Sequence, residues 1–122
     1  MAWLSTVRGN GQPECVPVWF LFRDDDSILM YSQPNTVKLR NIAENPKVTL
    51  VLDVTDIGRD VIRLEGVAQS DPSHQSAKDV PGYVEKYIER IGALFGSAEN
   101  FSCLFSEAIV ITPTKLQASV PG

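Results

Sequence analysis

Six short segments rich in strand-forming residues, separated by turn signals, constrain the fold more than any other feature of this sequence. The first two are joined by Arg8-Gly9-Asn10-Gly11, in which Asn-Gly supplies the positive φ angles of a tight hairpin. The predicted strands cover residues 3–7, 15–23, 27–32, 48–54, 61–69 and 108–112, the last resuming at 115–118 after an interruption at Pro113. Strands this short and this numerous favour a small closed or partly closed antiparallel β-barrel.

The second segment alternates in a way that covers both faces of its strand. One face carries Val16, Val18, Phe20 and Phe22, and the other carries Trp19 and Leu21. Since successive side chains point to opposite faces of a strand, we expect apolar contacts on both sides.

Three helices are predicted between the strands. The first begins at Asn35 or Thr36 and ends at Asn45-Pro46, because the residue before proline is pushed out of the helical region; its apolar stripe is Leu39, Ile42 and Ala43. The longest begins at Pro81, with an apolar stripe of Tyr83, Val84, Tyr87, Ile88, Ile91, Leu94 and Phe95. A third short helix is capped by Ser97 and turns Phe101, Leu104 and Phe105 inward.

The composition suits one small domain of 122 residues, of which 43% are hydrophobic and 21% charged. No apolar run approaches the roughly 18 residues that cross a bilayer, and no basic-then-apolar leader opens the chain, so the expected location is the cytoplasm. The formal net charge is −4 and the basic residues are scattered, which argues against nucleic-acid binding.

Metal and thiol chemistry find little support in the sequence. Cys15 and Cys103 are the only cysteines and His74 is the only histidine, whereas a zinc site needs about four such ligands. We expect no metal site and interpret one or both cysteines as small core hydrophobes. A Cys–His catalytic pair is the less favoured alternative.

The segment Lys38-Leu39-Arg40-Asn41 is the strongest candidate for ligand binding. It opens the first predicted helix, whose N-terminus presents free backbone N–H groups and partial positive charge suited to a phosphate. On a regular helix Lys38 and Arg40 point about 200° apart, so both reach one phosphate only at the helix end. Spacing alone favours the alternative that both are solvated residues of an amphipathic helix.

Several segments, in order, resemble the split β-barrel family of pyridoxamine phosphate oxidase-like flavoproteins. More narrowly, they are similar to its actinobacterial branch that uses the deazaflavin coenzyme F-420. The matching segments are Leu4-Ser5-Thr6-Val7, Gly11-Gln12-Pro13, Val16-Pro17-Val18-Trp19-Phe20, Tyr31-Ser32, Lys38-Leu39-Arg40-Asn41-Ile42, Asn45-Pro46-Lys47-Val48, Glu65-Gly66-Val67-Ala68 and Ile109-Val110-Ile111-Thr112-Pro113-Thr114. The ordered set restores the phosphate hypothesis for Lys38.

The resemblance implies a mainly β (α+β), six-stranded split β-barrel of the FMN-binding type, as one domain over residues 1–122. It implies phosphate binding by Lys38, Arg40 and Asn41. Pro17, Val18, Trp19 and Phe20 would lie against the cofactor ring, although barrel core is an equally good interpretation of Trp19 and Phe20. Tyr31, Ser32 and Gln33 would lie where the ring meets the phosphate tail, and Ser5 and Thr6 are weaker candidates.

The implied activity is hydride transfer from reduced F-420 to a small hydrophobic acceptor, such as a quinone or an unsaturated carbonyl compound. The cofactor performs the difficult chemistry, so no catalytic side chain is required; Tyr31 could donate a proton but is better interpreted as a packed tyrosine with a satisfied hydroxyl. Arg63 and Glu65 either border the ligand or form a cross-strand ion pair.

Two alternatives stay open: an FMN-dependent reductase or oxidase, and a non-catalytic carrier of F-420 or FMN. The family implies a homodimer with a cofactor site at each end of the interface. Its members usually begin with a helix, whereas Trp3 already starts the first strand here, so we expect a naturally short or a trimmed chain.

Overall fold

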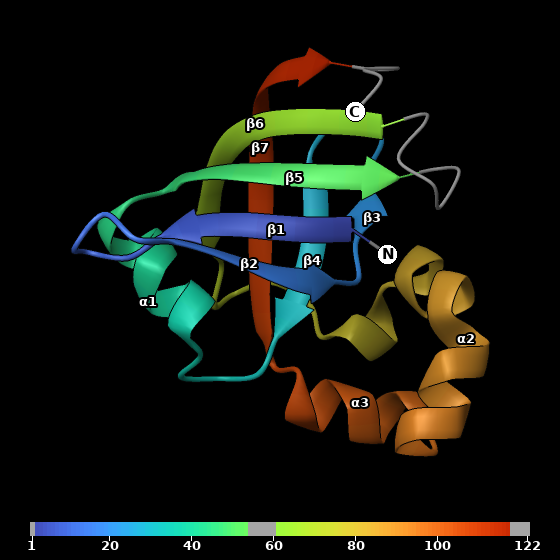
Figure 1. Cartoon of the computed structure of the whole chain (residues 1–122). Helices are drawn as coiled ribbons and strands as arrows, with labels where there is room; N and C mark the ends of the chain where they lie inside the picture. Colours follow the sequence, from blue (N-terminus) through green and yellow to red (C-terminus); the bar gives the residue numbers. More distant parts are fainter. Residues whose placement is uncertain (1, 54–60, 118–122) are drawn as a thin grey trace.

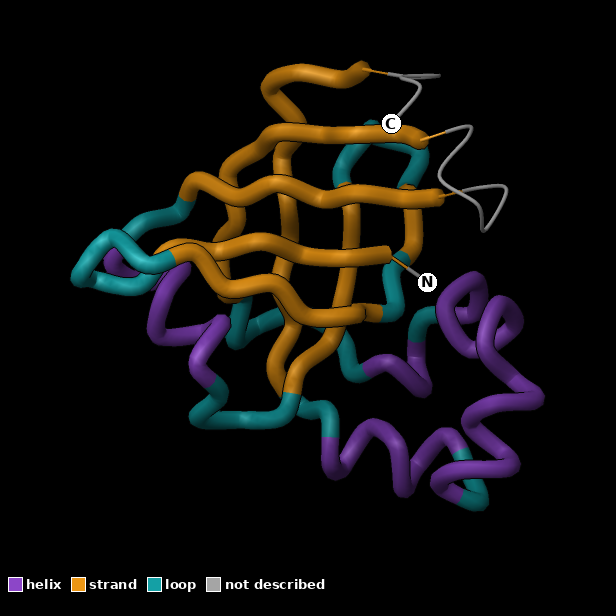
Figure 2. Tube along the Cα trace, viewed as in Figure 1, coloured by secondary structure: helices purple, strands orange, loops and turns teal. Residues whose placement is uncertain are grey.

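The computed structural model describes residues 2–53 and 61–117 as a curved sheet with helices at one end (Figures 1 and 2). The strands are β1 (Ala2–Val7), β2 (Pro13–Val18), β3 (Leu21–Phe22), β4 (Ile28–Ser32), β5 (Lys47–Asp53), β6 (Val61–Ser70) and β7 (Glu107–Gln117). The helices are α1 (Val37–Glu44), α2 (Pro81–Phe95) and α3 (Ala98–Leu104), with a 3₁₀ turn, η1, at Ala77–Asp79. Residues 54 and 118, the predicted ends of two strands, lie outside the described part.

The strands form one antiparallel sheet in the order β2-β1-β5-β6-β7-β4-β3. Its two edge strands, β2 and β3, follow one another in the chain with only Trp19 and Phe20 between them. The sheet must therefore curl until its edges meet, which produces a barrel that is split between β2 and β3. The predicted split β-barrel is confirmed.

The described sheet has seven strands instead of six, because the predicted strand 15–23 is broken at Trp19 and Phe20. This segment crosses from one edge of the sheet to the other, so no single partner strand can pair with its whole length. Its alternation is as expected as far as Leu21, whereas Phe22 is 48% exposed. Val16, Val18 and Phe20 pack on the barrel core, whereas Trp19 and Leu21 pack on the helical side.

The predicted interruption at Pro113 is wrong, since β7 continues through it. Gly66 pairs with Pro113 and Glu65 with Lys115, which leaves Thr114 as an extra residue in a β-bulge. A bulge accommodates proline because the ladder is already disrupted there.

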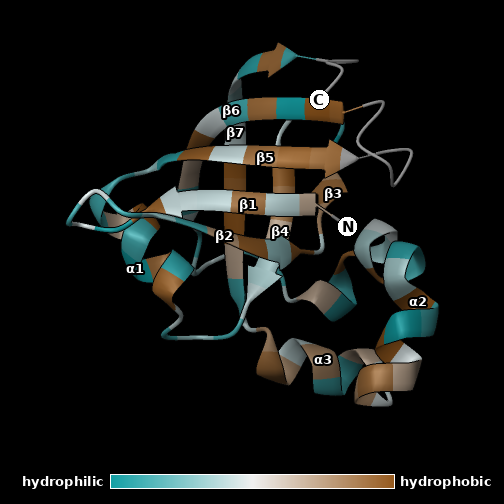
Figure 3. Cartoon of the chain, in the orientation of Figure 1, coloured by the Kyte–Doolittle hydropathy of each residue, from teal (hydrophilic) through white to brown (hydrophobic). Residues whose placement is uncertain are grey.

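Apolar residues gather in two clusters, visible as brown segments on the strands and on the helices in Figure 3. The barrel cluster includes Leu4, Ile28, Met30, Leu50 and Ile111. The second cluster lies between the sheet and helices α2 and α3, and includes Leu29, Tyr31, Tyr83, Tyr87, Ile91 and Phe101. The aromatic residues that concern the site belong to this second cluster.

The apolar stripes of the helices are narrower than predicted. On α2 the buried residues are Tyr83, Tyr87 and Ile91, spaced four apart, whereas Ile88 and Leu94 are 61% and 68% exposed. Tyr87 has non-helical backbone angles, which interrupts the regular turn of the helix and limits the buried face. Leu104 and Ala43, also predicted inward, are exposed.

The predicted helix boundaries agree with the structure better than the predicted apolar stripes do. Pro81 begins α2, and Ser97 caps α3 by accepting a hydrogen bond from the Asn100 N–H at 3.1 Å. Thr36 precedes α1, although its side chain makes no capping hydrogen bond. No helix in the described ranges combines the length and apolar character of a membrane span.

The interpretation of the cysteines as core residues is wrong. Cys15 lies on the exposed face of β2 and Cys103 on the exposed side of α3. Their neighbours Val16 and Ser102 take the inward positions.

Candidate functional site

An aromatic cavity of about 210 Å³ lies where the end of β2 meets β4, α1, α2 and α3. It is lined by Pro17, Val18, Trp19, Tyr31, Lys38, Tyr83, Phe95, Phe101 and Phe105. Tyr31, Tyr83 and Phe101 are buried and form its floor, while the other lining residues are partly or fully exposed and form its rim. Largely apolar walls with few polar groups are typical of small-molecule sites.

Trp19 forms the central wall of the cavity. Its ring stacks on Tyr87, with centroids 4.7 Å apart and planes 8° apart, and on Phe101 at 5.4 Å and 20°. Phe95 meets the same indole edge-on at 6.3 Å. These contacts hold the Trp19 ring in place within an aromatic wall of the cavity.

The strand break beside Trp19 is held by α2. Phe20 N–H donates to Tyr87 Oη at 2.8 Å, and Tyr87 Oη donates to the Phe20 carbonyl at 2.9 Å. Lys86 Nζ also donates to this carbonyl at 2.6 Å and lies 3.5 Å from the centre of the Phe20 ring. Burial lowers the pKa of Lys86. Side chains from α2 thus replace the missing strand partner.

Tyr31 is buried and its hydroxyl is engaged. The hydroxyl donates to the Gln75 carbonyl at 2.7 Å and lies 3.4 Å from His74 Nδ1, while Arg23 Nη1 lies 3.1 Å from His74 Nε2. Burial raises the pKa of Tyr31 to about 12. The structure therefore agrees with a packed tyrosine with a satisfied hydroxyl and not with a ready proton donor.

Tyr83 is fully buried in the floor of the cavity. Among the described residues, its hydroxyl is the one buried side-chain polar atom without a hydrogen-bond partner. Burial, with Tyr87 and Tyr31 nearby, raises the pKa of Tyr83 well above its ordinary value, so the hydroxyl stays protonated.

Lys38 brings a positive charge to the rim. It lies in the first turn of α1 and is half-buried, and it makes no ion pair or hydrogen bond with any described residue. Loss of hydration lowers the pKa of Lys38 from its ordinary value of 10.5. A partly desolvated cation without a counter-charge favours an anionic ligand.

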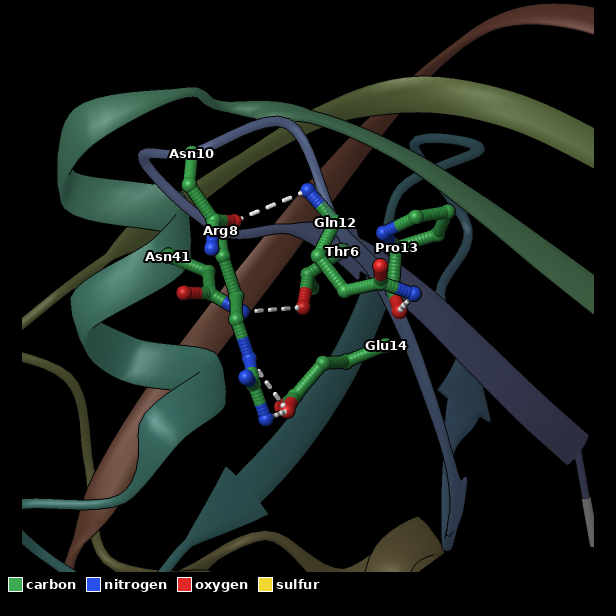
Figure 4. A network of polar contacts seen from close by, with 7 residues as sticks. All are labelled: Thr6, Arg8, Asn10, Gln12, Pro13, Glu14 and Asn41. Carbon is green, nitrogen blue, oxygen red and sulfur yellow. Dashed lines mark hydrogen bonds and ion pairs between the residues drawn. The ribbon is translucent and has the colours of Figure 1, made fainter.

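Arg40 and Asn41 point away from this cavity. Arg40 is exposed and lines a separate hollow with Arg8, Val37 and Glu44, as expected for residues two apart on a helix. Asn41 is buried and its Nδ2 donates to Thr6 Oγ1 at 2.9 Å, which ties α1 to β1 (Figure 4). Within this chain, therefore, Lys38 and Arg40 do not converge on one point.

The remaining predicted residues lie around the site without lining it. Ser32 is buried and bonds the Gln33 carbonyl at 2.8 Å and Thr36 Oγ1 at 3.0 Å, which shapes the turn into α1. Gln33 is exposed, and Phe20 faces the barrel core. Ser5 and Thr6 line a hollow on the sheet instead.

Arg63 and Glu65 also lie outside the cavity lining. Arg63 donates across the sheet to Gln117, and Glu65 pairs in register with Lys115. The described ranges show no ion pair between strands at either residue.

Four lining residues of the cavity are absent from the site that the sequence predicts. Tyr83, Phe95, Phe101 and Phe105 were assigned only to the buried faces of helices. The density of aromatic residues between positions 83 and 105 is the one sequence signal that could indicate that they line a cavity. Spacing along a helix cannot distinguish residues that line a cavity from residues that pack in the core, since both recur at helical intervals.

The strand order and the split between β2 and β3 define the class of split β-barrel proteins. A family model described as pyridoxamine 5'-phosphate oxidase matches residues 1–118, and the chain belongs to that family. No curated protein sequence matches the chain significantly.

Solved structures share this fold at low sequence identity. An F-420 reductase is 23% identical with a TM-score of 0.69, covering 95% of this chain and 87% of that one. General Stress Protein 26 from Bacillus anthracis is 21% identical with a TM-score of 0.69, covering 99% and 84%. HutZ, a heme storage protein from Vibrio cholerae, is 20% identical with a TM-score of 0.67, covering 99% and 87%.

Proposed function

We propose that the protein is an oxidoreductase that binds reduced coenzyme F-420 at the rim of the aromatic cavity and reduces a small hydrophobic acceptor of the quinone or unsaturated carbonyl type. The observation that carries this proposal is Lys38. Its half-buried ammonium has no counter-charge among the described residues and lies beside aromatic walls. A phosphate joined to a flat conjugated ring satisfies both parts of such a site.

The residues that line the cavity fit F-420. Lys38 would bind the phosphate, and Pro17, Val18 and Trp19 would contact the ring along the rim. Tyr31, Ser32 and Gln33 would lie near the point where the ring meets the phosphate tail, with Ser32 holding the turn into α1. When bound, the deazaflavin supplies the hydride, while the chain orients it and excludes water.

Arg40 and Asn41 take different parts in this proposal. Arg40, exposed in the separate hollow on the other side of α1, would contact the anionic tail of F-420 if the tail extends around this helix. Asn41 would act by positioning, since its bond to Thr6 fixes the helix that carries Lys38. Membership of the family and the similarity to an F-420 reductase support the choice of cofactor.

A homodimer in the cytoplasm is part of the same proposal, with cofactor sites at the interface. FMN is the alternative cofactor, because it also joins a phosphate to a flat ring. Lys38 with a single neighbouring arginine favours F-420 modestly.

A carrier function is the alternative from another class. Tyr31 is engaged and lacks the acid–base role of an enzyme residue, and the fold is shared with a heme storage protein. Turnover separates the two functions, since a carrier binds reduced F-420 but never oxidises it with any acceptor.

The test is parallel titration of the protein with F-420 and FMN, followed by fluorescence and absorbance. We expect F-420 to bind more tightly. Lys38→Ala should weaken binding by about 1.5–3 kcal/mol, the contribution of a hydrogen bond to a charged group. The exposed Lys78→Ala makes the same change in charge and should leave affinity unchanged. An unchanged affinity in Lys38→Ala rejects the phosphate assignment.

The pH dependence of binding gives a second measurement. Only the ammonium form of Lys38 attracts the phosphate, and its pKa in the free protein is already lowered by burial. Affinity should therefore fall as the pH rises through this lowered value, below the pH at which an exposed lysine titrates. Lys38→Ala should remove this alkaline decrease, and a decrease of equal size in both proteins would argue against Lys38.

A further inference from the structure

One polar atom of the aromatic cavity is not used by the proposed function. Tyr83 is fully buried, and its hydroxyl lacks any hydrogen-bond partner within the described part of the chain. The other tyrosine of the cavity, Tyr31, donates to the Gln75 carbonyl, and Tyr87 exchanges two hydrogen bonds with Phe20. An unsatisfied buried hydroxyl destabilises the fold by roughly as much as a lost hydrogen bond, so its retention needs a reason.

The Tyr83 hydroxyl can act only as an uncharged donor or acceptor. Because its pKa is raised by burial, it holds its proton across the physiological range. The nearest cation of the cavity lining is Lys38 on the rim, which is assigned to the phosphate. The floor therefore suits an uncharged ligand with a hydrogen-bond acceptor.

The shape of the floor suits a single ring. The cavity holds about 210 Å³, compared with roughly 150 Å³ for an apolar protein cavity that binds benzene. A whole tricyclic cofactor needs more space and can only lie across the rim. Trp19, Phe101 and Phe105 stack on one another and give the cavity apolar walls against which a ring can pack.

We propose that the floor of the cavity binds one uncharged aromatic ring of the acceptor, and that Tyr83 donates a hydrogen bond to a carbonyl oxygen attached to this ring. This inference deepens the proposed function and rests on it for the role of the ligand as acceptor. The hydroxyl is closed to solvent, so the carbonyl reaches it once a neighbouring ring shifts. Phe95 and Phe105 are only partly buried and meet edge-to-face at 5.5 Å, and they are the rings that we expect to shift.

A matched pair of probes tests the hydrogen bond. Acetophenone carries a carbonyl, and α-methylstyrene has the same shape with a methylene group in place of the oxygen. Each is titrated into the full chain without cofactor, and the indole N–H signal of Trp19 is followed by NMR after assignment with Trp3→Phe. We expect acetophenone to bind about tenfold more tightly than α-methylstyrene, as one buried hydrogen bond allows.

Tyr83→Phe should abolish this preference while both probes still bind, because only the hydroxyl is removed. Ser102→Ala, which removes a buried hydroxyl outside the cavity lining, should keep the preference. A preference that survives in Tyr83→Phe overturns the proposal, as does the absence of any Trp19 shift with acetophenone.

Two further arms separate this inference from the proposed function. Lys38→Ala should lose F-420 affinity and keep acetophenone binding. If the unaltered protein fails to bind F-420 but the Tyr83-dependent preference holds, the proposed function fails and the ring site stands. If Tyr83→Phe weakens F-420 and leaves the preference intact, the hydroxyl serves the cofactor and the acceptor assignment is overturned.

Discussion

Two tyrosines one turn apart on α2 carry identical hydroxyls with opposite roles. Tyr87 Oη accepts from the Phe20 N–H and donates to the Phe20 carbonyl, so it replaces a strand partner where β2 ends. Tyr83 Oη has no partner among the described residues. Burial raises the pKa of both groups, and the shift is opposed by the Phe20 backbone at Tyr87 and by the Tyr31 backbone at Tyr83.

The stability of phenylalanine variants should differ between these positions. Tyr87→Phe leaves the buried Phe20 N–H without its acceptor, so we expect the free energy of unfolding to fall by about 1–3 kcal/mol. Tyr83→Phe removes a hydroxyl that bonds nothing, and should leave stability unchanged or slightly raised. Urea unfolding at neutral pH measures both, and equal losses in the two variants would contradict these assignments.

At the scale of single residues, the sequence predicts the directions of neighbouring side chains on a helix better than it predicts contacts between distant positions. Helical geometry correctly indicated that Lys38 and Arg40 point apart, since this depends only on local spacing. It could not indicate that Tyr87 reaches Phe20, because the two are 67 positions apart and the bond forms only after the barrel closes. The unused hydroxyl of Tyr83 is likewise visible only in three dimensions.

Among the elements, the pairing of β6 with β7 depends on a close backbone approach at the bulge. A Cβ added at Gly66 would lie 2.7 Å from the Thr112 carbonyl oxygen and 2.8 Å from Ile111 Cγ2. Larger side chains do not tolerate such contacts, so glycine is required at this position for its small size, beside the β-bulge at Thr114.

Gly66→Ala should therefore destabilise the protein by about 1–3 kcal/mol, the typical cost of overpacking. Gly92→Ala is a matched control, because a Cβ there meets nothing within 4 Å and alanine favours the exposed helix. Thermal unfolding should show a lower Tm for the first variant and an equal or higher Tm for the second. A Gly66→Ala protein as stable as the parent would mean that the strands separate here without cost.

The elements were predicted well where local pattern decides them, and less well where closure of the barrel decides them. The hairpin between β1 and β2 and the start of α2 at Pro81 follow from residue type, although in the hairpin only Gly11 has the positive φ predicted for Asn10-Gly11. The break at Trp19 and the continuity of β7 through Pro113 follow from partners distant in sequence. The narrow buried face of α2 has the same origin, since only the row of side chains nearest the sheet finds a partner.

At the scale of the whole molecule, an apolar strip crosses the outer face of the sheet next to the cavity. Trp3 on β1 pairs in register with Pro17 on β2 and Val51 on β5, so the three side chains share one face. Trp3 is 48% exposed, and Pro17 is exposed and also lines the rim of the cavity. Exposed apolar strips of this kind commonly mark protein interfaces.

We expect a second copy of the chain to cover this strip and to complete the rim around the cofactor. Sedimentation at micromolar concentration should give twice the monomer mass of 13.4 kDa, and a species of 13.4 kDa would reject the dimer. Trp3→Asp should produce monomers, because it would bury a carboxylate at the interface, whereas Leu116→Asp, at an exposed position on β7, should stay dimeric.

Since Pro17 lies both in the strip and on the rim, F-420 affinity should fall with dimerisation in Trp3→Asp and not in Leu116→Asp. Unchanged affinity in a monomeric Trp3→Asp protein would show that one chain alone forms the cofactor site.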